Sequence, residues 1–171
     1  MNTLYRTVDS LDRAAFTILP TLARVIFAGV LFFYFWNSAL TKLDGTSLSL
    51  GAYAQIFPRA MEAAGFDPSQ LSPVQTAIVW AGTMAEFVLP VLLLIGLLTR
   101  LAAVGMIGFV LVQTATDILG HGADSSTIGL WFDRLPDAAL ADQRALWIAL
   151  FSIPLFLGAG PLSLDRLLFR R

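Results

Sequence analysis

The stretch Val74–Leu98 reads VQTAIVWAGTMAEFVLPVLLLIGLL and carries one formal charge, Glu86. It is long enough to cross a bilayer as a helix, because a span needs about 20 apolar residues. At a rise of about 1.5 Å per residue, Glu86 lies near the middle of the hydrocarbon layer, where an ionised carboxylate is costly. The small and polar residues of the stretch fall on the same helix face as Glu86. We therefore expect this face to contact other helices, with the carboxyl protonated, paired or exposed to water.

The composition of the whole chain predicts an integral membrane protein. Hydrophobic residues make up 57% of the 171 residues and charged residues only 13%, whereas soluble domains carry about 25% charged residues. Apolar periodicity predicts an all-α fold, a transmembrane four-helix bundle with short interfacial helices, in one domain over 1–171. The spans are expected at about 20–40, 74–98, 101–119 and 145–162.

The remaining segments are expected to lie at the membrane surface. Residues 1–19 have helical spacing of apolar residues and predict a short surface helix; a cleavable signal peptide is the competing interpretation. Residues 41–73 predict an interfacial helix broken at Pro58, which is either a lid over a site or a surface loop. The tail from Ser163 predicts a short interfacial helix with this serine as its N-cap.

The basic residues predict the orientation, because cytoplasmic segments carry the excess of Lys and Arg. With four spans, both termini and the short turn at Thr99-Arg100 fall on one side, and both long loops fall on the other. The first side carries more basic residues and is predicted to be cytoplasmic. These residues are Arg6, Arg13, Arg24, Arg100, Arg166, Arg170 and Arg171.

Charge and residue usage argue against several classes of function. The net charge is −1 and the 11 Lys and Arg residues are scattered, so we expect no nucleic-acid partner. The chain has no Cys and therefore no dithiol, iron–sulfur ligand or disulfide. It has one His, too few for a bis-His haem or a His-rich metal site, and no metal site is predicted.

Spans two and three form a hairpin that predicts a polar cluster inside the bundle. Glu86 and Gln113 each lie about 18 Å along their helices from the connecting turn, so their side chains fall at one depth. Asp117 follows one turn further outward on the same face as Gln113. We add Lys42 and Asn37, near the outer end of span one, as further candidates for ligand or proton handling. The stem of Lys42 is expected to extend outward to the interface.

These polar residues allow a structural and a functional interpretation. Glu86 either fixes helix register through Gln113, as a neutral carboxyl at pH 7, or forms a ligand or proton site. Asp117 and His121 lie one turn apart, either as a proton relay or as a solvated helix end. The tryptophans are expected as interfacial anchors, with stacking on a quinone as the alternative.

Arg24 and Asp165 are both predicted to lie near the cytoplasmic surface. A structural ion pair between them is the preferred interpretation, and binding of an anionic ligand by Arg24 is the alternative.

Three groups of residues, taken together, carry a family resemblance. They are Arg24 with Lys42-Leu43; Ala85-Glu86 with Leu93, Gly96, Leu97, Thr99-Arg100 and Ala102-Ala103; and Gly158, Gly160 and Ser163-Leu164-Asp165. In this order, over all four spans, they resemble the DoxX family of small four-helix membrane proteins. The chain departs from the family at Val88-Leu89-Pro90, where many members carry glycines, which indicates a subgroup.

The resemblance implies a protein of the bacterial inner membrane. The family takes its name from a thiosulfate:quinone oxidoreductase, and other members are linked to redox stress and to sulfur or metal handling. It implies a quinone-associated subunit of a redox system, with the lipid bilayer, an electron-supplying partner protein and a second copy of the chain as partners. No covalent cofactor is expected, and quinone is the expected ligand. The alternative is a non-catalytic membrane scaffold or a small-solute carrier.

Overall fold

Helix α5 (Pro73–Ile95) contains the Glu86 stretch and has well-defined signals at both ends. Ser72 and Gln75 form a capping box at its start, with Pro73 in the first turn. At its end, Gly96 takes a left-handed conformation with φ +70°. The structure is a computed structural model that describes residues 2–169, and the side chains from Asp9 to Phe169.

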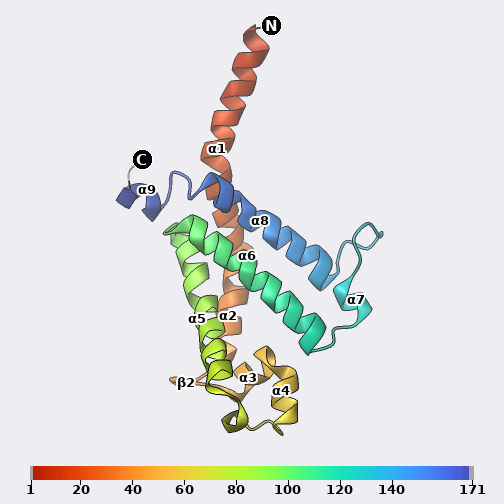
Figure 1. Cartoon of the computed structure of the whole chain (residues 1–171). Coiled ribbons are helices and arrows are strands. Elements are labelled where there is room, and N and C mark those ends of the chain that lie inside the picture. Colours follow the sequence, from red (N-terminus) through yellow and green to blue (C-terminus); the bar gives the residue numbers. More distant parts are fainter. Residues whose placement is uncertain (1, 170–171) are drawn as a thin grey trace.

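The first helix is longer than predicted. Helix α1 (Asn2–Val30) continues almost directly into α2 (Phe32–Thr41), and Leu31 keeps the hydrogen-bond ladder by donating to the Phe27 carbonyl at 2.9 Å. The separate surface helix expected over 1–19 is therefore wrong. No breaker precedes Pro20, and this proline is accommodated inside the helix, so the N-terminal part of α1 extends beyond the bundle (Figure 1).

Helix α6 (Thr99–Ala115) follows α5 after a short turn and passes into a π-helical segment, η2 (Thr116–Gly120). Gly105 allows the two helices to approach closely, because a Cβ atom there would lie 2.7 Å from Leu89 Cδ2. This confirms the predicted α5–α6 hairpin.

The long segment after α2 contains short elements. A hairpin of β1 (Leu43–Asp44) and β2 (Ser47–Leu48) precedes α3 (Leu50–Ile56), α4 (Pro58–Ala63) and the 3-10 turn η1 (Pro68–Gln70). The predicted helix break at Pro58 is confirmed, because this proline is the first residue of α4.

The last third of the chain returns across the bundle. After α7 (Ser125–Ile128) and the π-helical segment η3 (Ala139–Gln143), helix α8 runs over Arg144–Leu157. It ends earlier than the predicted 162, because Gly158 adopts φ +81° and leaves the helix. Helix α9 (Leu164–Phe169) follows, and Ser163 Oγ accepts from the Arg166 N–H at 3.2 Å as the predicted N-cap.

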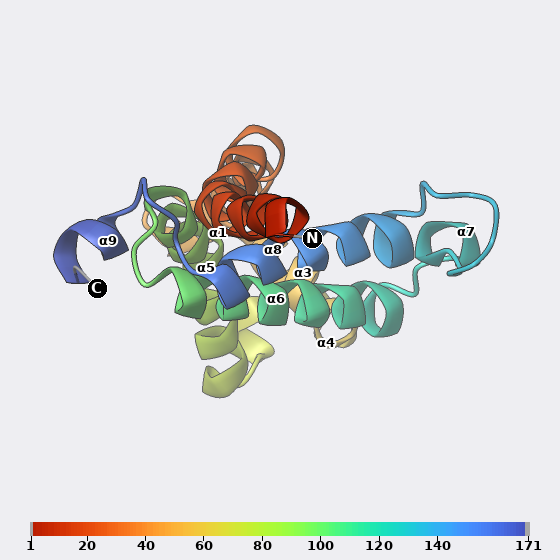
Figure 2. The ribbon, with the colours of Figure 1, turned by 90° about the horizontal axis from the view of Figure 1, so that it is seen from above.

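The helices form an all-α membrane bundle. Seen from above, α8 lies between α1 and α6 (Figure 2). The core draws on every long helix, with Phe27, Phe35, Leu93, Met106 and Phe151 fully or almost fully buried. Among the described residues, four helical segments are long and apolar enough to cross a membrane: Asp9–Val30, Pro73–Ile95, Thr99–Gly120 and Ala139–Leu157.

Both ends of the described chain lie toward the α5–α6 turn, away from α3 and α4 (Figure 1). This arrangement agrees with an even number of spans. Which of the two sides faces the cytoplasm stays a prediction from the distribution of basic residues.

Arg24 joins three parts of the bundle through backbone carbonyls. Its guanidinium donates to Leu93 and Leu94 at the end of α5, and to Ala159 and Leu162 in the α8–α9 connection, at 2.6 to 2.9 Å. The predicted direct ion pair between Arg24 and Asp165 is not formed, although the two charges are close enough to interact. Carbonyl groups at the end of a helix lack hydrogen-bond partners within the helix and attract a cation. Here such carbonyls bind the guanidinium of Arg24, which therefore does not pair with Asp165.

Asp165 caps the start of α6 instead. Its two carboxylate oxygens accept from the backbone N–H groups of Leu98 at 2.7 Å and Thr99 at 2.9 Å. Partial burial opposes ionisation of this carboxyl, but these hydrogen bonds and the charge of Arg24 outweigh it and hold its pKa below the usual range.

The variant Asp165→Asn should therefore melt at a lower temperature than the wild type at pH 7, because an amide offers only one acceptor to two N–H groups. Since the folded-state pKa is lowered, this stabilisation is present above the unfolded-state pKa of about 3.9 and is lost as the pH falls through the folded-state value. Thermal melts in detergent should show the difference at pH 7 shrinking toward pH 3. Asp137→Asn, at an exposed loop residue, is the control, and equal melting of both variants at pH 7 would contradict the capping role.

Candidate functional site

A cavity of about 390 Å³ lies between α5 and α6. Residues from α2 and α3 complete its wall. Its apolar part is built from small side chains and glycines, which leave the space open, and from a few large apolar side chains. The residues of this part are Ile56, Ile78, Ala81, Gly82, Ala85, Leu89, Gly105, Gly108, Phe109 and Val112.

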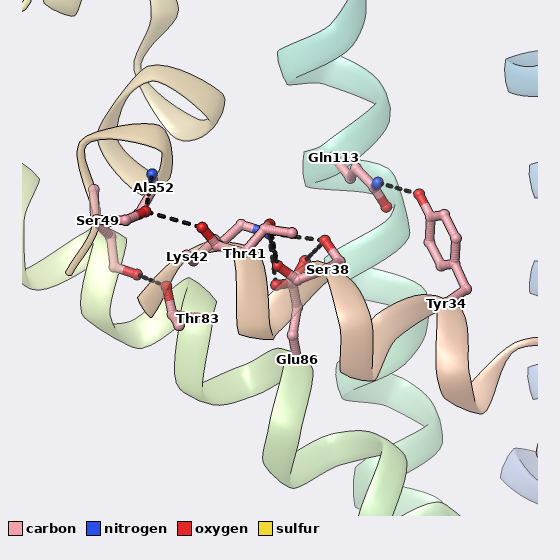
Figure 3. Close-up of polar contacts among 10 residues, drawn as sticks. Tyr34, Ser38, Thr41, Lys42, Ser49, Ala52, Thr83, Glu86 and Gln113 are labelled. Carbon is pink, nitrogen blue, oxygen red and sulfur yellow. Dashed lines mark hydrogen bonds and ion pairs between the residues drawn. The ribbon is translucent and has the colours of Figure 1, made fainter. Parts of the chain in front are cut away.

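The polar end of the cavity is built around a buried ion pair. Lys42 Nζ lies 2.7 Å from Glu86 Oε2, and the two side chains are 6% and 3% exposed. Ser38 connects them, because its Oγ donates to Glu86 Oε1 at 3.1 Å and accepts from Lys42 Nζ at 2.9 Å. Figure 3 shows the three side chains converging from α2 and α5. The cation that pairs with Glu86 is thus Lys42.

Lys42 is the first residue after α2, and backbone hydrogen bonds hold the following segment against it. Its carbonyl accepts from the Ser49 N–H at 2.9 Å, and Ser49 Oγ donates to the Thr41 carbonyl at 2.9 Å. These bonds fold the β1–β2 hairpin back onto the helix end. The prediction that Lys42 extends outward to the interface is wrong, because its ammonium is buried beside Glu86, where the close contact and the hydrogen bond to Ser38 offset the cost of burying the charge.

Gln113 lines the same cavity as Glu86 but has a different partner. Its Nε2 donates to the Tyr34 hydroxyl at 2.8 Å (Figure 3). The expected hydrogen bond between Gln113 and Glu86 is not formed. The Gln113 Oε1 atom is buried and accepts no hydrogen bond from the described residues. An unsatisfied buried acceptor is rare in proteins and favours a donor from a ligand or water.

Asp117 also lines the cavity, and its partner is Arg144. The Arg144 guanidinium donates to the Asp117 carboxylate and, at 2.9 Å, to Thr114 Oγ1. Sequence reasoning missed Arg144, which is 6% exposed. The available signal was a basic residue directly before the fourth apolar stretch. Both members of the pair lie at π-helical segments, which are frequent at functional sites.

The other sequence candidates separate into two groups. His121 is exposed, lines the cavity edge and hydrogen-bonds through Nε2 with the Gln55 carbonyl at 3.0 Å. Asn37 is exposed and lies outside the cavity wall. No tryptophan lines the cavity in the described part of the chain, so Phe109 is the aromatic ring available there. Among the same residues, no group of three or more His, Cys, Asp or Glu could hold a metal ion.

The segment after α2 covers one end of the cavity. Gln55 and Ile56 of α3 line it, and Ile56 Cδ1 lies only 3.3 Å from where a Cβ atom of Gly82 would be. Pro58 packs in the same way on Gly120, because Pro58 Cγ lies 2.9 Å from where a Cβ atom of Gly120 would be. Of the two interpretations for residues 41–73, these contacts favour the lid.

The Asp117–Arg144 pair makes a testable contribution to stability. Arg144→Met should leave the Asp117 carboxylate without its cation and lower the free energy of unfolding by roughly 2 to 4 kcal/mol, less than for a fully buried pair because Asp117 is partly exposed. Arg134→Met, at an exposed loop position, is the control and should change little. Denaturant unfolding in detergent measures both, and equal stability of the two variants would show that the pair is dispensable.

The sequence model of the DoxX family matches residues 19–121. The match covers most of the chain from α1 to η2 and includes Lys42, Glu86, Gln113 and Asp117. It stops before α8, so the fourth span and Arg144 lie outside it, although the resemblance in the sequence was expected over all four spans. No curated protein and no solved structure matched the chain. Since the match covers more than half of the chain, and the described helices include candidate membrane spans, the chain belongs to the DoxX family of membrane proteins.

Proposed function

We propose that the cavity between α5 and α6 binds the head group of a membrane quinone, and that the chain acts as the quinone-binding membrane subunit of a redox system. The main support is that the buried, unsatisfied Gln113 Oε1 and the Lys42–Glu86 pair belong to one cavity whose remaining wall is mostly apolar. Small-molecule sites typically combine such an apolar wall with a few converging polar groups, in volumes of roughly 300 to 1,000 Å³.

The polar groups suit a ring that carries oxygens on opposite sides. The Lys42 ammonium can donate to a quinone oxygen in place of its long hydrogen bond to the Ser38 carbonyl, at 3.4 Å, and Gln113 Oε1 is an acceptor for the hydroxyl of the reduced form. Phe109 and Leu89 offer apolar contact to the ring between these groups. Entry from the bilayer is supported by Ile78 and Val112, which line the cavity and are 47% and 68% exposed on the bundle surface.

Proton handling would use the residues that are already in place. Reduction of a quinone adds two electrons to the ring system and one proton to each of its two oxygens, and oxidation of the quinol reverses this. Glu86, next to Lys42 and Ser38, can exchange a proton with the bound ring. Asp117 and His121 line the same cavity, and the exposed His121 connects this part of the wall with the surface. The electrons would come from a partner protein, because this chain has no Cys and one His.

Quinone binding can be measured on the purified, delipidated protein in detergent, with decylubiquinone as the probe and decylbenzene, which has the same tail but no oxygens, as its comparison. Gln113→Leu should weaken binding of the reduced form of decylubiquinone roughly tenfold, because the hydrogen bond from its hydroxyl to Gln113 Oε1 contributes about 1 to 1.5 kcal/mol. The titration is therefore carried out with the reduced form. Asn37→Leu, on the same helix as Ser38 but outside the cavity, should bind like the wild type.

Two results would contradict the proposal. The first is equal binding of decylbenzene and decylubiquinone, which would leave a non-catalytic scaffold as the better interpretation. The second is a Gln113→Leu variant that binds the reduced probe as tightly as the wild type and melts at the same temperature as the wild type. Preferential binding of a polar solute without a tail would instead favour the small-solute carrier.

A further inference from the structure

A second hollow, of about 380 Å³, lies beside the α8–α9 connection. Arg100 at the start of α6 and Arg166 of α9 line it, together with residues 158–160 and Phe169. It shares no lining residue with the cavity between α5 and α6.

The charge of this hollow is positive. Arg100 donates through Nη2 to the Phe156 carbonyl at 3.3 Å, and neither Arg100 nor Arg166 forms a salt bridge within the described residues. Asp165 also lines the hollow, but both of its oxygens accept from backbone N–H groups of the α5–α6 turn. The hollow is therefore lined by two guanidinium groups and by one carboxylate whose oxygens already accept hydrogen bonds.

Gly158 lies beside the guanidinium of Arg100 in the wall of the hollow. A Cβ atom at Gly158 would lie 3.8 Å from Arg100 Nε, and this glycine has φ +81°. The volume of the hollow leaves room for an anion of the size of a phosphate group next to Arg100, and guanidinium groups bind phosphate oxygens in a paired geometry.

The position of the hollow matches the level of lipid head groups. One candidate span begins at Thr99 and another ends at Leu157, so both end beside it. The side chains of α9 next to Arg166 are apolar and exposed: Leu167, Leu168 and Phe169 are 69%, 62% and 57% exposed. A short helix with a charged residue and exposed apolar residues at this level is suited to the membrane interface.

We infer that Arg100 and Arg166 bind the phosphate of an anionic glycerophospholipid, whose acyl chains lie along the apolar surface of α9. Basic pockets at the ends of transmembrane helices bind anionic head groups in this way. A free phosphate ion offers the same oxygens but lacks chains for the apolar surface, so the structure favours the lipid.

The test uses the delipidated protein in a neutral detergent and follows its melting temperature against added dihexanoyl phosphatidylglycerol. The lipid should raise the melting temperature of the wild type, because a ligand that binds the folded state stabilises it. In Arg100→Gln/Arg166→Gln the apparent affinity should fall by at least roughly tenfold. The matched control Arg59→Gln/Arg134→Gln removes two exposed arginines that do not line the hollow, and it should keep the wild-type response.

Three results would overturn the inference. They are an unchanged response in Arg100→Gln/Arg166→Gln, an equal response to dihexanoyl phosphatidylcholine, and an equal response to inorganic phosphate at the same concentration, which would assign the site to a free anion. If the double variant does not fold, Arg166→Gln alone decides the question, because within the described residues the Arg166 side chain forms no hydrogen bond or ion pair that a glutamine would break. It should then show a weaker response than Arg59→Gln, and an equal response would count against the site.

Discussion

The ion pair between Lys42 and Glu86 is the contact on which the site depends. Moving two charges out of water costs several kcal/mol for each ion, and only close approach with further hydrogen bonds offsets this cost. At 2.7 Å, with Ser38 bonded to both partners, the pair meets this condition. It fixes the end of α2 against the middle of α5, so the chain must turn at this point and form the hairpin that leads into the lid.

Polar contacts inside this bundle connect segments that are far apart in the sequence. Arg24 holds the end of α5 and the α8–α9 connection through carbonyl groups, and Arg144 holds Asp117 of η2 from the start of α8. Between these contacts, glycines and alanines let α5 and α6 approach at one end and leave a cavity at the other. In a bilayer, where apolar packing gives little preference for one neighbour over another, such contacts decide which helices meet.

The sequence allowed four apolar spans and the burial of Glu86 inside the bundle to be predicted, because both follow from hydropathy and from the position of a charge within a span. The α5–α6 hairpin and the Ser163 cap were predictable from local signals. The partners of the polar side chains were not. Gln113 lines the same cavity as Glu86, but its amide bonds to Tyr34, and Arg24 bonds to carbonyls and not to Asp165, because helix rotation and the α8–α9 connection are set by tertiary packing. Arg144 was missed because it stands at a helix start, where a charge is usually solvated.

The most direct test of this account is a double-mutant cycle on Lys42 and Glu86, measured as the free energy of unfolding of the purified protein in mixed micelles. Lys42→Met and Glu86→Gln should each be strongly destabilising, because each leaves a buried partner without its counter-charge. The double variant should lose clearly less than the sum, with a coupling energy above about 1 kcal/mol. Losses that add to within about 0.5 kcal/mol would show that the two side chains do not interact, and would contradict the site as described.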